Sequence, residues 1–177
     1  APEFVEGWGM YSEQMMREQG FDDAPAFRLA LATDAIWRAA RIVLDVRMHR
    51  GEVSIEEATQ FLIDHTGFER PNALAEARRY TYTPSYNLSY LLGKVLILKL
   101  RDEEKARLGS AFSLRDFHDA LLRGGSLPVS FHRRELHGEG RSAVAAERHV
   151  PQHRDRRSAR APRPRVERHS EERPVAP

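Results

Sequence analysis

Apolar residues recur with the spacing of an α-helix from the start of the chain. At about 100° per residue, one side of the first helix carries Phe4, Trp8, Tyr11 and Met15. The opposite side carries Glu6, Met10, Glu13 and Arg17. This pattern alone predicts an amphipathic helix with a solvated acidic face, on which Glu13 and Arg17 form an i,i+4 pair worth about 0.2–0.5 kcal/mol.

The same periodicity and a series of capping residues predict five more helices. Pro25 begins a segment of about residues 26–50, and Ser54 with Glu57 forms a capping box that opens the next. The others cover about residues 70–80, 85–108 and 113–122. Only short breaks separate these segments, so we expect an all-α fold, a bundle of about six helices. Residues 85–108 form the most apolar segment and should be central.

The helix expected at residues 26–50 has an apolar stripe and a charged edge. The stripe, flanked by Trp37, contains Leu29, Ile36, Ala40, Val43 and Leu44. The edge opposite contains Asp34, Arg38, Arg41, Asp45 and His49. Such an edge is either a solvated ladder of ion pairs or one wall of a charged cleft.

A polar stripe also runs along the apolar segment at residues 85–108. It consists of Asn87, Tyr90, Lys94 and Arg101. An unpaired polar group on a buried helix costs about 1–3 kcal/mol. These four side chains should therefore face a cavity or another polar surface.

Two segments resemble the bacterial "domain of unknown function 885" family. The first is Glu6-Gly7-Trp8, continuing to residue 14, and the second runs from Arg79 to Lys94. At the Asn87 position the family more often has Gln. Further similarity at residues 41–49 and 124–136 extends the resemblance over about residues 4–136.

Members of this family look like zinc metallopeptidases, in which an upstream His-Glu-x-x-x-His-type helix supplies two imidazoles. The Glu of Glu-Gly-Trp is the third ligand, so the resemblance implies Glu6 as a zinc ligand. The eight histidines include no His-Glu-x-x-His pair, and His118 is expected to be a hydrogen-bonded structural residue rather than a ligand. We therefore expect the C-terminal part of a longer protein, whose N-terminal portion is the partner that completes the zinc site.

The resemblance also suggests residues that handle a peptide or other small substrate. One of Tyr80, Tyr86 and Tyr90 is expected to stabilise an oxyanion, as tyrosines commonly do in such peptidases. Arg41 or Arg79 is expected to hold a substrate carboxylate. Because residues 41–49 resemble the family, Asp45 and His49 are assigned with Arg41 to a cleft wall that binds substrate. The alternative to a hydrolase fragment is a non-catalytic helical module for binding or assembly.

The composition changes near residue 136. Every Phe, Trp and Tyr lies at or before Phe131, and the net charge of +2 conceals a basic excess at the C-terminal end. Residues 137–177 have no hydrophobic period, and such a segment buries too little surface to offset its ordering entropy. The expected organisation is a helical domain at residues 1–136 and a disordered Arg/Pro-rich tail at residues 137–177.

The same composition bears on partners and compartment. Arg-rich tails bind phosphates, but acidic residues dilute this tail and it has no aromatic residue to stack on bases, which argues against nucleic acid. No apolar run reaches membrane-spanning length, so no membrane partner is expected. The absence of cysteine fits a reducing compartment such as the cytoplasm, although a targeting signal in a longer protein would not be visible here.

Overall fold

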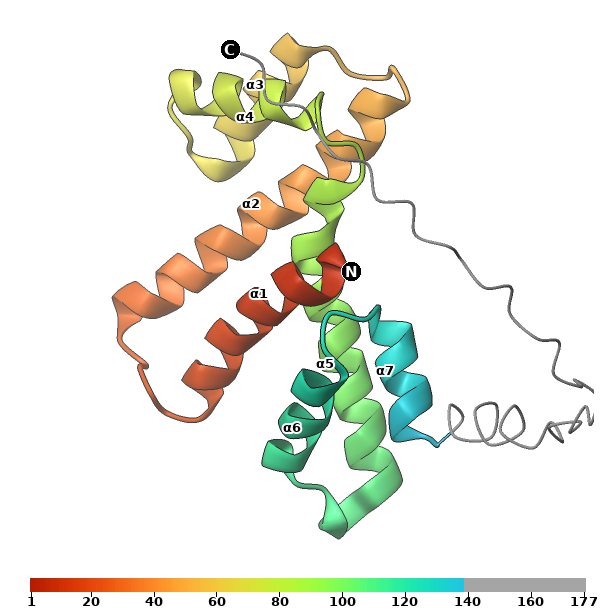
Figure 1. Ribbon diagram of the computed structural model, residues 1–177. Coiled ribbons are helices and arrows are strands. Elements are labelled where there is room, and N and C mark those ends of the chain that lie inside the picture. Colours follow the sequence, from red (N-terminus) through yellow and green to blue (C-terminus); the bar gives the residue numbers. More distant parts are fainter. Residues whose placement is uncertain (139–177) are drawn as a thin grey trace, which may run out of the picture.

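The computed structural model describes residues 1–138, which form seven α-helices and two short 3-10 helices (Figure 1). The α-helices are α1 (Pro2–Glu18), α2 (Pro25–His49), α3 (Ile55–Thr66), α4 (Arg70–Tyr80), α5 (Ser89–Leu108), α6 (Leu114–Gly124) and α7 (Val129–Leu136). The 3-10 helices are η1 (Tyr86–Leu88) and η2 (Gly109–Ala111). These residues contain no strand, which confirms the all-α prediction. The tail expected to be disordered lies outside the described residues, apart from its first two.

Helix boundaries follow the capping residues closely. Ser54 accepts a hydrogen bond from the Glu57 N–H in the predicted capping box, and Ser113 caps α6 in the same way through Asp116. Two features were not predicted. Helix α5 begins at Ser89 rather than Ser85 because η1 precedes it, and α7 has only eight residues, too few for a clear periodic signal.

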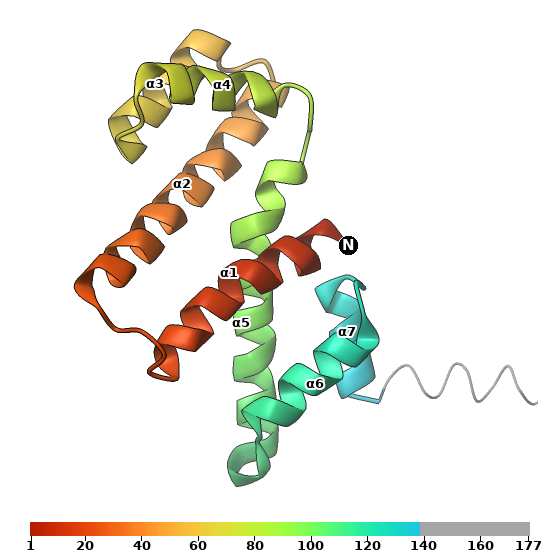
Figure 2. The ribbon, with the colours of Figure 1, turned by 60° about the vertical axis from the view of Figure 1, so that its left-hand side comes forward.

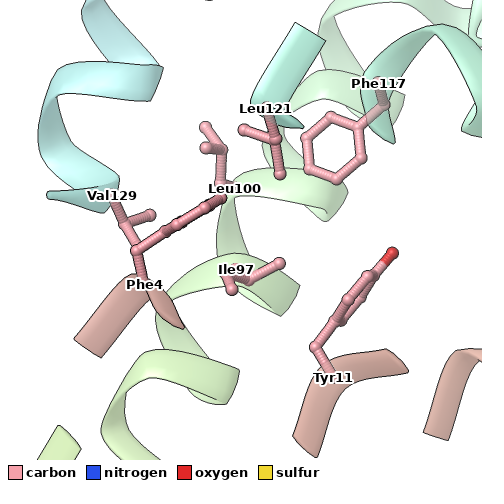
Figure 3. Close-up of a cluster of buried hydrophobic side chains, with 7 residues drawn as sticks. All are labelled: Phe4, Tyr11, Ile97, Leu100, Phe117, Leu121 and Val129. Atoms are coloured by element: carbon pink, nitrogen blue, oxygen red, sulfur yellow. The ribbon is translucent and has the colours of Figure 1, made fainter. Parts of the chain in front are cut away.

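Two separate hydrophobic clusters stabilise the two halves of the fold. The first cluster, drawn in Figure 3, joins α1, α5, α6 and α7 through Phe4, Tyr11, Ile97, Leu100, Phe117, Leu121 and Val129. The second joins α2, α3 and α4 through Ala40, Leu44, Ala58, Leu62, Ala73, Ala77 and Tyr80. The halves meet where α2 packs against η1 and α5.

Helix α2 buries only Ala40 and Leu44 of the stripe that its sequence predicts. Leu29, Ile36 and Val43 are 68%, 51% and 41% exposed. Arg41 and Asp45, from the predicted charged edge, are buried instead. That part of the prediction was wrong because periodicity separates the faces of a helix without indicating which face a neighbour covers.

Helices α1 and α5 cross, as Figure 2 shows. Their backbones are in contact at Gly7 and Gly93. A Cβ atom added to Gly7 would lie 2.7 Å from the Lys94 nitrogen. One added to Gly93 would lie 2.8 Å from the Gly7 Cα and closer still to the Glu3 carbonyl oxygen. Helix backbone cannot yield as a flexible side chain does, so both positions require glycine.

Replacing Gly93 by alanine should therefore force α1 away from α5. We expect Gly93→Ala to lower the free energy of unfolding by about 3 kcal/mol, measured by urea denaturation. The matched control is Gly9→Ala on α1, where a Cβ would meet no atom within 4 Å and the better helix propensity should add about 0.5–1 kcal/mol. Equal stability of the two variants would contradict the crossing.

Two histidines pack into the half built around α5. His132 is buried, and its ring centroid lies 4.4 Å from that of Phe4. His118 Nε2 shares a hydrogen bond of 2.7 Å with the Tyr11 hydroxyl, the structural role expected for this residue. Burial lowers the pKa of both imidazoles below the ordinary 6.5.

Both histidines should make stability depend on pH in the same direction. Below pH 6.5 the unfolded chain takes up protons that folded His118 and His132 resist, so protonation favours unfolding. We expect the free energy of unfolding to fall as the pH is lowered below about 6.5, measured by urea denaturation. The double variant His118→Gln, His132→Gln should flatten this slope; an unchanged slope would refute the assignment.

Candidate functional site

Glu6 on α1 meets the segment that leads into α5. The Tyr86 hydroxyl donates a hydrogen bond to Glu6 Oε1, and this bond is the largest cause that raises the pKa of Tyr86 above its ordinary 10.0. The ring of Tyr90 lies edge-on to that of Tyr86, with centroids 5.9 Å apart. One of the three predicted oxyanion tyrosines thus contacts the predicted zinc ligand, and a second packs against the first.

The charged edge of α2 faces these tyrosines. The Arg41 guanidinium carbon lies 5.0 Å from the Tyr90 ring centroid, and that of Arg38 lies 6.0 Å from it. Both guanidinium carbons are also 4.0 Å from the Trp37 ring centroid. These cation–π contacts connect α2 to α5 without a direct ion pair.

Glu76 on α4 accepts hydrogen bonds from three side chains of this region. Its Oε2 accepts hydrogen bonds from Arg41 at 3.1 Å, Arg79 at 2.9 Å and the Tyr80 hydroxyl at 2.9 Å. Burial raises the pKa of Glu76, but the bonds from Arg79 and Tyr80 and the charge of Arg41 outweigh it, so the pKa is lowered. Burial is also the main cause that raises the pKa of Tyr80 to about 12.

Asp45 holds the turn that precedes Tyr86. Its carboxylate accepts from the Ser85 N–H at 3.1 Å and the Asn87 side-chain amide at 3.2 Å. His49 Nδ1 bonds the Asp45 backbone carbonyl at 2.8 Å and lies 3.0 Å from the carboxylate. Ser85 has φ 67°, and within residues 1–138 it alone among non-glycine residues has a positive φ. Such a conformation persists only where the surroundings hold it, and here buried Asp45 does so.

The eight predicted site residues form a connected set that runs from α1 through η1 and α5 to α2 and α4. They are Glu6, Arg41, Asp45, His49, Arg79, Tyr80, Tyr86 and Tyr90. The predicted ladder of Arg41, Asp45 and His49 exists only in part, because Arg41 pairs with Glu76 while His49 pairs with Asp45. His49 also lines a cavity of about 240 Å³ between the end of α2 and the start of α3.

Two members of the polar stripe predicted at residues 85–108 have side-chain partners. Asn87 bonds Asp45, and Arg101 pairs with Glu18 at 2.8 Å. Lys94 is half-buried, and burial lowers its pKa. Sequence reasoning missed Glu76, although its position three residues before Arg79 and four before Tyr80 on a predicted helix is a usable signal.

The described residues do not form a metal site by themselves. Within residues 1–138 no three His, Asp or Glu side chains gather closely enough to hold a metal ion. A catalytic zinc needs three protein ligands, of which Glu6 can supply one. Its hydrogen-bonded partner Tyr86 would orient the carboxylate, as the neighbours of metal ligands do.

The profile of the bacterial proteins of unknown function designated DUF885 matches residues 1–136. The chain belongs to the DUF885 family. A crystal structure described as "the putative lipoprotein from Colwellia psychrerythraea" is similar to this DUF885 chain with 35% identity and a TM-score of 0.74. The match covers 77% of the DUF885 chain and 24% of the Colwellia chain, so the present chain spans about a quarter of the length of that protein.

Two further findings concern the DUF885 chain. No curated protein matches it. Among the helices formed by residues 1–138, none combines the length and apolar character needed to cross a membrane.

Removal of the Asp45 carboxylate should destabilise the site severely. Asp45→Ala leaves the Ser85 N–H and the Asn87 amide without this acceptor, so we expect the free energy of unfolding to fall by about 3 kcal/mol. Asp34→Ala is the control, because the Asp34 side chain is 41% exposed and pairs only with Arg38 one turn away on the same helix, so the change should cost about 1 kcal/mol or less. Thermal and urea unfolding measure both, and equal losses would contradict the role of Asp45.

Proposed function

We propose that this DUF885 chain is the C-terminal part of a zinc-dependent, peptidase-like hydrolase in which Glu6 supplies one zinc ligand. The hydrogen bond from Tyr86 to Glu6 carries the proposal. It brings the carboxylate of the Glu-Gly-Trp segment and a tyrosine of the second family-like segment to one point. The N-terminal portion of the longer protein would supply two imidazoles and the general-base glutamate.

Two of the three tyrosines are suited to different tasks in such a site. Zinc, when bound, polarises a carbonyl and lowers the pKa of a water molecule. Tyr86 is 38% exposed, and its single O–H, which is donated to Glu6 here, would turn to an oxyanion beside Glu6 once zinc engages that carboxylate. Tyr80 is fully buried and commits its hydroxyl to Glu76, which suits a supporting role.

The two candidate arginines also differ in access to a substrate. Both guanidiniums bond Glu76, but the Arg79 side chain is 37% exposed whereas that of Arg41 is 5% exposed. We therefore assign a substrate carboxylate to Arg79 and the positioning of Glu76 to Arg41. A peptide or another small molecule with a free carboxylate fits this arrangement, because a guanidinium binds a carboxylate with two parallel hydrogen bonds.

Zinc binding tests the proposal directly. The present chain alone should bind zinc weakly and show little or no peptidase activity, because it lacks two imidazoles and the general base. Joined to the polypeptide encoded upstream of Ala1, it should bind one zinc ion, measured by metal analysis after dialysis. Glu6→Ala should weaken that binding by more than about 100-fold and leave the helical content of the metal-free protein unchanged.

Glu13→Ala is the matched control, since Glu13 lies on the same helix seven residues further on. It should bind zinc as the unmodified protein does. Stoichiometric zinc on the present chain alone, or hydrolysis retained by Glu6→Ala in the longer protein, would place the chemistry elsewhere.

A second candidate is a non-catalytic helical module for binding or assembly. The observation that favours it is that residues 1–138 lack a three-ligand cluster. It predicts that the longer protein also binds no zinc, so the same metal analysis decides between the two functions.

A further inference from the structure

The outer face of α2 carries an unbroken apolar seam with heptad spacing. Its members are separated alternately by three and four residues: Leu29, Ala32, Ile36, Ala39, Val43 and Val46. All six are exposed. Exposed apolar patches of this extent mark interaction surfaces in soluble proteins.

The other faces of α2 already have partners within the fold. Ala40 and Leu44 belong to the cluster with α3 and α4, while Arg41 and Asp45 bond residues of α4 and of the turn before η1. In Figures 1 and 2 the N-terminal half of α2 extends beyond α3 and α4. The seam is therefore a surface that the described residues leave open rather than part of either core.

The spacing identifies the kind of occupant. Alternate steps of three and four residues match the knobs-into-holes packing of a second helix, and a strand or loop has no such repeat. Small alanines alternate with the larger Leu29, Ile36 and Val43, which lets a partner backbone approach between the larger side chains. From Leu29 to Val46 the seam is about 25 Å long, enough for four to five turns of a partner helix.

We propose that this seam docks an α-helix from the N-terminal portion of the longer DUF885 protein. The Colwellia chain contains the same fold as 24% of its length, so most of that solved protein is chain outside the matched region. Exposed Arg28 and Arg47 flank the two ends of the seam, which favours a partner helix with acidic residues at those ends. A second copy of α2 would instead bring arginines together at the ends in either orientation.

The experiment uses the absence of cysteine from the chain. Ile36→Cys places a single thiol in the seam, and Gln60→Cys places one at an exposed polar position on α3. Each variant is prepared in the present chain and in the protein extended by the polypeptide encoded upstream of Ala1. Reaction with N-ethylmaleimide, in buffer containing EDTA, is followed by mass spectrometry.

We expect the Ile36→Cys thiol to react at least about tenfold more slowly in the longer protein than in the present chain, because a docked helix must open first. The Gln60→Cys rate should change by less than about twofold. If the Ile36→Cys variant does not fold, Val43→Cys, seven residues further along the seam, replaces it in the same measurement.

Two outcomes would overturn the docking proposal. One is equal reactivity of the seam thiol in the two proteins. The other is protection in the present chain alone that increases with protein concentration, because a second copy would then be the occupant. The proposal shares with the proposed function only the longer protein, and since zinc is absent from the assay, failure of the zinc site and failure of docking are distinguishable.

Discussion

The contact between α1 and α5 at Gly7 and Gly93 determines the position of everything else in the site. Because neither residue has a Cβ, the two backbones touch, and the side chains of α1 on either side of the crossing have fixed neighbours. On one side Phe4 and Tyr11 join Ile97 and Leu100 in a core. Elsewhere on α1, Glu6 reaches the hydroxyl of Tyr86. A wider crossing would separate Glu6 from its tyrosine.

Two carboxylates organise the polar contacts of α2. Buried Asp45 connects the two halves of the molecule, because it accepts from the Ser85 N–H and from Asn87 on η1, whereas partly buried Glu76 connects α2 to α4 within one half. Without these carboxylates the donors would be left unpaired, and an unpaired buried donor is costly. The contacts of Asp45 lie at the junction between two apolar clusters, where they specify one relative position of η1 against α2.

The sequence predicted helix boundaries better than helix surroundings. Ser54, Ser113 and Pro25 act within one turn of backbone, so their effect is local and readable. Glu6 and Tyr86 could be selected only through the family resemblance, because their contact joins residues far apart in the chain. The partner of Arg41 was missed, since Asp45 lies one turn away on the same helix and Glu76 on another. The burial of a helix face depends on tertiary neighbours that periodicity does not contain.

The order of the helices has a consequence for how the chain folds. The second core consists of α2, α3 and α4, which follow one another along the chain. The first core cannot form until α5 is available, because α1 packs against α5, and α5 follows these three helices in the sequence. Contacts of such high sequence separation form late because a long loop must close first. During that interval Phe4, Trp8 and Tyr11 remain in water, so the aromatic face of α1 is the surface most open to aggregation in a newly made chain.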